Sequence, residues 1–317
     1  MIAGMDISKL KFDVTVLLEN SKEKHKTFHN TLEGFKELDT WLQGFKVDNA
    51  HICLEATGSY GEKVSLFLHQ QGYKVSIVNP TRIKAYARSE GLRTKTDKVD
   101  SGVIARFCKA QSPLQWHPPG PAEQALKELY RCLQNLLEDK GRLSNRLENL
   151  DEGKTSFTIW QELLEAVEQQ IKEVENQIKT LVEIHETLKV QVKLLKTIPG
   201  VSDKTAVAIL SELPPVQVFD TAKEMAAFAG LTPYVRQSGT SLKGKGTLSK
   251  VGNAQIRKAL YMPALVAKTH NPVIKEFCGR LMDKGKATMV VIAAAMRKLL
   301  HIIFGVLKNK KEFTFAS

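Results

Sequence analysis

A chain of 317 residues is long enough for about two domains, and its 43% hydrophobic and 25% charged residues are ordinary for a soluble globular protein. The net charge of +12 and the isoelectric point near 9.4 favour an acidic polymer such as nucleic acid as a partner. The four cysteines have no CxxC spacing, which disfavours a zinc site, and three of them lie in apolar patterns typical of buried thiols in a reducing cytosol.

The first 110 residues alternate between strand-like and helix-like patterns. The expected elements are two strands in 2–18, a strand at 24–29, a helix at 31–45, a strand at 50–56, a helix at 61–72 and a strand at 73–80. Thr31, three residues before Gly34, marks the start of the first helix. This alternation predicts an α/β fold with a partly parallel sheet, in which ligands gather at the carboxyl ends of the strands.

Four acidic residues stand where an unbalanced carboxylate is costly. Asp6 lies inside the first apolar run and Glu55 closes the run AHICLEA, although an ionised carboxylate resists burial. Asp97 and Asp100 lie three residues apart at the start of a predicted helix. If the four converge, their repulsion requires cations. Mg²⁺, with Mn²⁺ as the alternative, binds carboxylate and phosphate oxygens together. The set therefore predicts metal-assisted phosphoryl transfer on nucleic acid.

The pair near residue 97 also has a purely structural interpretation. Thr96 or Asp97 could cap the helix, and acids in a first helical turn are favoured by the helix dipole. Capping and metal binding are compatible with each other.

The segment SPLQWHPPGP, residues 112–121, is the clearest break in the chain, since its four prolines cannot continue a helix. From residue 122 to about 195, apolar residues recur at three-four spacing between charged flanks. This pattern predicts a coiled-coil or dimerisation segment, with an amphipathic hairpin inside one subunit as the alternative. We therefore expect three domains, at 1–120, 121–195 and 196–317.

The segment after residue 195 carries two further signals. Two helical patterns meet at Ile198–Val201, which is similar to a helix-hairpin-helix whose backbone N–H groups bind phosphate, with a plain helical turn as the alternative. Farther along, a glycine-rich stretch carries six basic residues and no acid, which predicts a nucleic-acid contact rather than a solvated charged loop. The six are Arg236, Lys243, Lys245, Lys250, Arg257 and Lys258.

The last third contains the most apolar stretch of the chain, residues 287–307. Arg297, Lys298 and His301 interrupt it, so it predicts a helix packed in the core and no membrane span. The opening MIAGMDISKLK lacks the pattern of a signal peptide.

A family resemblance covers nearly the whole chain. The motifs GMDISK, LEATGSY, IVNP, SEGLRTKTDKVDS, IPGV, FAGLTP, RQSGTS, LSKVGNAQIRKALYMPALVA and MRKLL occur in this order. The chain thereby resembles the "IS one-ten" insertion-sequence transposases, the bridge-RNA-guided recombinases, and also the Piv-type DNA invertases. The resemblance implies an N-terminal RuvC-like (ribonuclease H-like) domain with a DEDD acidic set and a mainly helical C-terminal transposase domain with a serine.

Carried over by position, the acidic set is Asp6, Glu55, Asp97 and Asp100, and the serine is Ser238 of RQSGTS, with Ser241 as its neighbour. The resemblance implies strand exchange through a phosphoserine intermediate. It further implies a bridge RNA that pairs with target and donor double-stranded DNA, assembly from dimer to tetramer, and a cytoplasmic, nucleoid-associated bacterial location. Two alternatives remain. One is a metal-dependent nuclease or Holliday-junction resolvase that uses water, and the other is an inactive nucleic-acid-binding protein.

Overall fold

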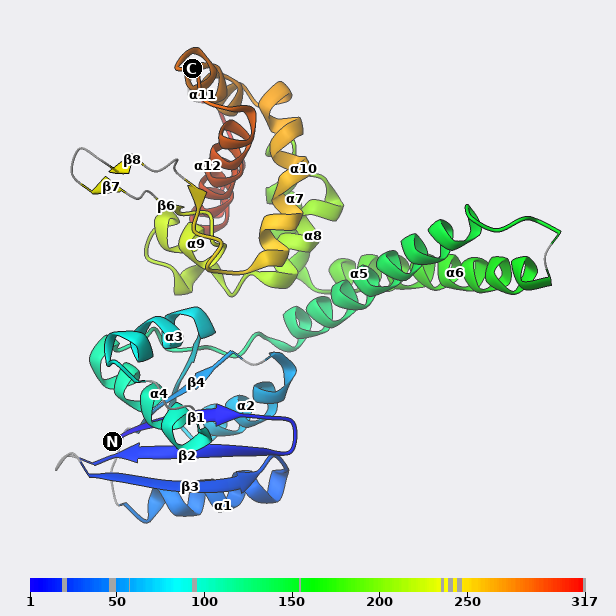
Figure 1. The fold of residues 1–317 in the computed structure, drawn as a ribbon. Helices are drawn as coiled ribbons and strands as arrows, with labels where there is room; N and C mark the ends of the chain where they lie inside the picture. The colour runs from blue at the N-terminus through cyan, green and yellow to red at the C-terminus, as the bar shows by residue number, and fades with distance from the viewer. Residues whose placement is uncertain are drawn as a thin grey trace. The chain divides into compact units, whose positions relative to one another are not determined.

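The computed structural model describes residues 1–18, 22–45, 50–56, 58–92, 96–153, 155–234, 237–238, 242–243 and 247–315. The chain folds into two compact units, Met1–Pro118 and Pro119–Ser317, which are considered separately (Figure 1). The division falls in the proline-rich segment, beside the boundary expected after residue 120. The boundary expected after residue 195 lies inside the second unit and stays a prediction.

The first unit is built on a five-stranded sheet with the order β3-β2-β1-β4-β5 (Figure 1). The strands are β1 (Ile2–Ile7), β2 (Lys11–Leu17), β3 (Glu23–His29), β4 (His51–Glu55) and β5 (Lys74–Val78). β1 pairs antiparallel with β2 and parallel with β4, and β4 pairs parallel with β5. The predicted α/β fold with a partly parallel sheet is confirmed.

Helices cover both faces of this sheet. They are α1 (Leu32–Gln43), the short 3₁₀ helix η1 (Gly58–Gly61), α2 (Glu62–Gln70), α3 (Pro80–Ser89) and α4 (Asp97–Gln111). The side chain of Thr31 caps α1 by accepting from the backbone N–H of Gly34, as expected. The first-unit elements predicted from the sequence are all present at their expected places.

Alternate residues of β1 face opposite sides of the sheet. Ala3, Met5 and Ile7 belong to an apolar layer shared with α1 and α2. The residues between them face α4, and a Cβ atom at Gly4 would overlap the backbone of Ser101 and Ala105 in that helix. The absence of a side chain at Gly4 therefore lets α4 lie directly on β1. Asp6 is two residues farther along the same face.

The second unit is helical apart from a small ribbon. Its helices are α5 (Pro121–Leu147), α6 (Thr155–Ile184), α7 (Glu186–Lys196), α8 (Asp203–Glu212), the 3₁₀ helix η2 (Val216–Val218), α9 (Ala222–Phe228), α10 (Ala254–His270), α11 (Pro272–Asp283) and α12 (Thr288–Asn309). α5 and α6 form a long hairpin that projects from the other helices of this unit (Figure 1). Its role in self-association stays a prediction.

α12 is the longest apolar element of the second unit. By length and composition it could cross a membrane, with a mean hydropathy of 2.0. However, Val291, Ala295, Leu299 and Ile303 have no exposed surface, and α12 packs against α7, α9, α10 and α11. The predicted core-packed helix is confirmed.

The turn between α7 and α8 joins two helices at the predicted place, as both a helix-hairpin-helix and a plain helical turn would. Gly200 takes a left-handed conformation (φ +101°), and a Cβ there would lie 2.9 Å from the Cβ of Ala267 in α10. The side chain of Ser202 caps α8 by accepting from the N–H of Thr205. The turn thus packs on α10, and its contact with phosphate stays a prediction.

Candidate active site

Two of the predicted acids lie at the carboxyl ends of neighbouring parallel strands. The register of β1 and β4 pairs Met5 with Leu54, so Asp6 and Glu55 occupy the next position. Both therefore point to the face of the sheet that α4 covers. Glu55 is the last residue of its strand, as expected for a ligand site in an α/β sheet.

The other two predicted acids lie in the first turn of α4. The helix is capped by Thr96, whose Oγ1 accepts from the N–H of Val99 at 3.3 Å. Asp97 and Asp100 follow the cap and are favoured there by the positive end of the helix dipole. Because α4 lies on β1 at Gly4, its first turn reaches the same edge of the sheet as Asp6.

The electrostatics of Asp6 show that the acids share one neighbourhood. Burial, and after it the charges of Asp100, Glu55, Asp97 and Asp13, together raise the pKa of Asp6 from 3.8 to about 6. Among the described residues, no three His, Cys, Asp or Glu side chains lie close enough to ligate a single ion. The carboxylates thus repel one another through space without closing around a common point. We call Asp6, Glu55, Asp97 and Asp100 the acidic edge.

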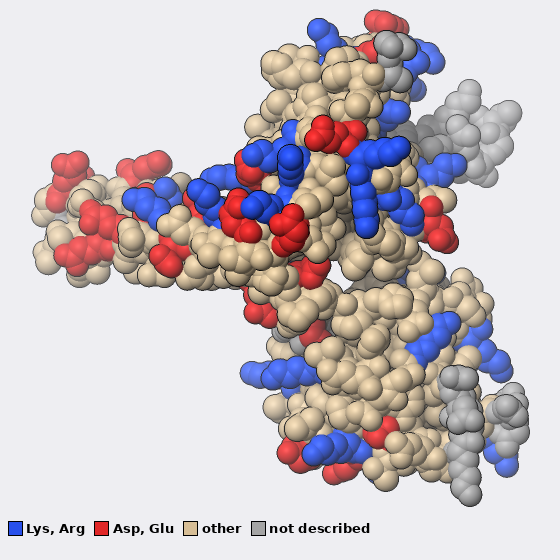
Figure 2. All heavy atoms as spheres, turned by 180° about the vertical axis from the view of Figure 1, so that it is seen from behind, with Lys and Arg blue, Asp and Glu red and all other residues tan. Residues whose placement is uncertain are grey.

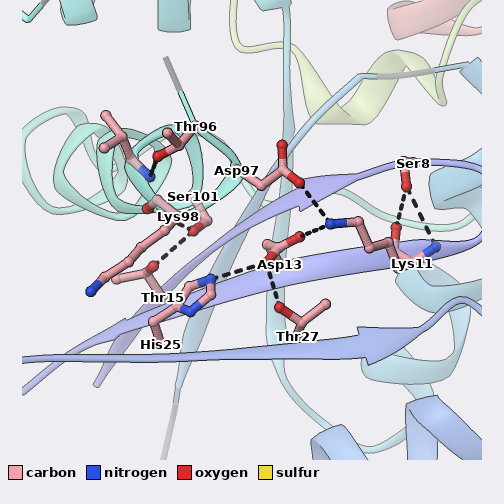
Figure 3. A network of polar contacts seen from close by, with 11 residues as sticks. Ser8, Lys11, Asp13, Thr15, His25, Thr27, Thr96, Asp97, Lys98 and Ser101 are labelled. Carbon is pink, nitrogen blue, oxygen red and sulfur yellow. Dashed lines mark hydrogen bonds and ion pairs between the residues drawn. The ribbon is translucent and has the colours of Figure 1, made fainter. Parts of the chain in front are cut away.

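A fifth acid and a lysine, both missed by sequence reasoning, lie against the acidic edge (Figure 3). The Nζ of Lys11 donates to Asp97 Oδ2 at 2.7 Å and lies 3.5 Å from Asp13 Oδ2. The Asp13 side chain is only 6% exposed, and its Oδ1 accepts from Thr27 at 2.6 Å and lies 3.0 Å from His25 Nε2. The hydrogen bond and charge of Lys11 lower the pKa of Asp97.

The signal that could have found these residues is the alternation in KFDVTV. Period two puts Lys11, Asp13 and Thr15 on one face of β2. The antiparallel register then places Asp13 directly opposite Asp6. This register depends on the length of the turn between β1 and β2. The apolar pattern alone does not give that length, so it does not predict that Asp13 lies opposite Asp6.

The predicted serine lies in a ribbon of four very short strands in the second unit. These are β6 (Pro233–Tyr234), β7 (Gln237–Ser238), β8 (Leu242–Lys243) and β9 (Thr247–Leu248). β6 pairs with β9 and β7 pairs with β8, and Ser238 is opposite Leu242 (Figure 1). The backbone of Ser238 therefore lies in the outer pair of strands. Ser241 lies outside the described residues.

The base of the ribbon is held by a close backbone crossing. Gly230 (φ +70°) and Gly252 (φ +156°) approach so closely that a Cβ on Gly252 would overlap the N atom of Gly230. The Nη1 of Arg257 donates to the carbonyl of Ala229 at 3.0 Å and to that of Gly252 at 3.2 Å. Burial lowers the pKa of Arg257. This side chain holds the crossing, and its contact with nucleic acid stays a prediction.

A buried carboxylate ties the same region to the hairpin. Glu212 of α8, whose side chain is 2% exposed, lies 3.0 Å from Arg131 Nε of α5. It also accepts from Asn253 Nδ2 at 3.0 Å. Asn253 in turn caps α10 by accepting from the backbone of Gln255 and Ile256. We call Glu212, Arg131 and Asn253 the Glu212 node, in which both carboxylate oxygens of Glu212 accept hydrogen bonds.

The other predicted nucleic-acid contacts differ in their surroundings. Lys250 is exposed and has a left-handed backbone (φ +54°). Lys258 lies 3.5 Å from Glu138 in an exposed ion pair. Lys and Arg side chains gather over the helical body of this unit and along the inner part of the hairpin (Figure 2). The predicted contacts whose side chains lie outside the described residues are Arg236, Lys243 and Lys245.

The first unit is thus an α/β unit with clustered carboxylates, and the second is a helical unit rich in basic residues. Comparison with known families specifies the class. A DEDD transposase family model, described as transposase, matches residues 3–152. A second model, described as the transposase IS116/IS110/IS902 family, matches residues 192–278.

Individual relatives agree with these matches. A pilin gene-inverting protein of Moraxella bovis is 34% identical over 313 residues, which are 98% of this chain and 96% of the relative. The transposase for insertion sequence element IS1328 of Yersinia enterocolitica is 25% identical, over 99% of this chain and 98% of the relative. The chain therefore belongs to the IS110 family, the "IS one-ten" transposases. It is a transposase or DNA recombinase.

Proposed function

We propose that this transposase cuts and rejoins DNA strands through a phosphoserine at Ser238, with divalent cations held by the acidic edge. The observation that carries the proposal is the neighbourhood of four carboxylates from β1, β4 and α4, in which the charges of Asp100, Glu55 and Asp97 add to the effect of burial on the pKa of Asp6. The mixed sheet with helices on both faces supports a RuvC-like assignment for the first unit.

The donor set suits Mg²⁺, with Mn²⁺ as the alternative. Asp6, Glu55, Asp97 and Asp100 offer only carboxylate oxygens, which hard cations prefer. Burial first, and then the charges of the neighbouring carboxylates, raise the pKa of Asp6. A bound ion would polarise the scissile phosphate and stabilise the leaving oxygen. The four carboxylates would position the ions at the exposed edge of the sheet, where a DNA backbone can approach.

Ser238 supplies the nucleophile in this proposal. Its hydroxyl oxygen bonds to phosphorus and gives up its proton, while the bond from phosphorus to one sugar oxygen breaks and that oxygen leaves as a hydroxyl. The phosphoserine keeps a phosphoester, so rejoining needs no external energy source. A cation such as Arg236 would offset the charge that develops on the phosphate.

The family resemblance leads us to propose the partners as well. A structured bridge RNA would pair with target and donor DNA, so that base pairing sets the sequence and the protein contacts backbone and shape. The α5–α6 hairpin would join protomers into a dimer or tetramer in the bacterial cytoplasm. Light scattering tests assembly directly, and a monomer in the presence of RNA and DNA would contradict it.

The serine is tested by trapping the covalent adduct. Nucleic acid that copurifies with the protein is sequenced to define the substrate, and the adduct formed on that substrate is mapped by peptide mass spectrometry. Ser238→Ala should lose the adduct, whereas the neighbouring Ser241→Ala should retain it. Cleavage without any adduct, or an adduct on another residue, would replace this proposal with a resolvase that uses water.

A further inference from the structure

We propose that Lys11 is a built-in counter-ion of the acidic edge, which binds Asp97 in the metal-free protein and passes to Asp13 when a divalent cation binds. The inference rests on the proposed function in one respect, that the acidic edge binds divalent cations. Lys11 and Asp13 are then positioning residues, because they control access of the ion to Asp97 without touching the reacting phosphate.

The first step in the argument is that Lys11 already lies between two carboxylates. Its ammonium is 2.7 Å from Asp97 and 3.5 Å from Asp13, so the move from one partner to the other is short (Figure 3). The ammonium occupies Oδ2 of Asp97, and its positive charge repels a divalent cation that binds to the same carboxylate. Binding of the ion to Asp97 and the present hydrogen bond of Lys11 are therefore in competition.

Asp13 is built as a fixed acceptor. It is directly opposite Asp6 in the β1–β2 register, and two like charges at such a cross-strand pair repel each other. Thr27 and His25 hold Oδ1 and leave Oδ2 facing Lys11. Because Asp13 is buried and hydrogen-bonded, it keeps its position when Lys11 moves.

The backbone of Lys11 is fixed, whereas its side chain is free to move. Ser8 Oγ donates to the carbonyl of Lys11 at 2.7 Å, and the backbone N–H of Ser8 donates to the same carbonyl at 2.9 Å. The side chain of Lys11 is 49% exposed. A compact ammonium on a flexible stem can exchange between carboxylates, whereas the planar fork of an arginine would hold Asp97 through two hydrogen bonds.

The test is calorimetric titration of the full chain with Mn²⁺ at fixed pH and low salt. We expect Lys11→Met to bind Mn²⁺ about 3- to 10-fold more tightly than wild type, because the competitor is removed. Lys11→Arg and Asp13→Asn should both bind Mn²⁺ more weakly than wild type, since the positively charged side chain of residue 11 then stays on Asp97. In the Lys11→Met background, Asp13→Asn should change the affinity by less than about twofold.

The matched control is Lys9→Met, which removes a positive charge from the same turn. It should change the affinity by less than about twofold, because exposed charges without a direct contact are largely screened. As a second readout, Lys11→Met should unfold at a lower temperature than wild type in EDTA and show a larger rise on addition of Mn²⁺.

The outcomes separate this inference from the proposed function. A wild-type protein that binds no Mn²⁺ overturns both. If wild type binds Mn²⁺ and Lys11→Met binds it equally well, or if Lys9→Met has the same effect, the counter-ion role is wrong and the metal site stands. An undiminished effect of Asp13→Asn in the Lys11→Met background would show that Asp13 acts on the ion directly, and would overturn the exchange.

Discussion

The acidic edge of the first unit and the Glu212 node of the second unit differ in what surrounds their carboxylates. Glu212 is almost fully buried, yet Arg131 balances its charge, and both of its carboxylate oxygens accept hydrogen bonds from Arg131 or Asn253. Asp6 is less buried, and its burial together with the charges of four nearby acids raises its pKa to about 6. The sequence shows an acid in an apolar pattern in both places. Only the three-dimensional partners distinguish them.

The difference separates a structural carboxylate from the carboxylates that we propose to bind cations. A balanced buried carboxylate stabilises the fold, and its removal leaves partners without a match. A crowded set of carboxylates destabilises the fold and persists where an external cation relieves the repulsion. The comparison predicts opposite responses to neutralising substitutions at the two places.

The largest expected effect concerns strand cleavage. Asp6→Asn, and likewise Glu55→Gln, Asp97→Asn or Asp100→Asn, should reduce cleavage by at least about 10²-fold, because the electrostatic stabilisation of the reaction is lost. Nucleic-acid binding and the fold should persist, which filter binding and circular dichroism would check. Full recombination in EDTA would contradict the assignment of these carboxylates.

The next effect is on stability at the Glu212 node. Glu212→Ala should lower the free energy of unfolding by about 2–4 kcal/mol, since Arg131 and Asn253 lose a buried partner. Glu175→Ala is the matched control, because it breaks an exposed ion pair with Lys204 and should cost less than about 1 kcal/mol. Urea unfolding measures both, and equal costs would remove the distinction drawn here.

A smaller effect should appear in the pH dependence of stability. Because the pKa of Asp6 is raised from 3.8 to about 6, the folded protein holds this proton more tightly than the unfolded chain does. Ionised Asp6 therefore destabilises the fold above about pH 6, and the penalty disappears as the pH falls from about 6 to 4. In EDTA, Asp6→Asn should be more stable than wild type at pH 7.5 by on the order of 1 kcal/mol, allowing for its partial exposure. A difference that does not shrink with falling pH would contradict this.

Much of the first unit could be predicted from the sequence, because its apolar residues recur with the period of a strand or of a helix. The alternation in β1 and the cap at Thr31 are local signals, and the structure bears them out. Asp13 was missed because its importance depends on register, and a register is fixed by pairing between strands. The Glu212 node was missed for the same reason, since its members lie far apart in the chain.

The smallest effect concerns the basic stretch. Neutralising Lys243, Lys245 and Lys250 together should lower the slope of binding against salt by up to about three, because each phosphate contact releases roughly one counterion. Neutralising Lys140, Lys189 and Arg280, which form exposed ion pairs outside this stretch, is the control. An unchanged slope in the first variant would show that this stretch does not contact the DNA backbone.

The most direct test of the acidic edge is the response of thermal unfolding to Mg²⁺. In EDTA, Asp6→Asn should unfold at the same or a higher temperature than wild type, because it lacks the repulsion. Saturating Mg²⁺ should reverse the order, since an ion at about 100 times its dissociation constant stabilises the wild type by about 2.7 kcal/mol and the variant by far less. An equal rise in both proteins, or no rise in wild type, would show that the acidic edge is not a divalent-cation site.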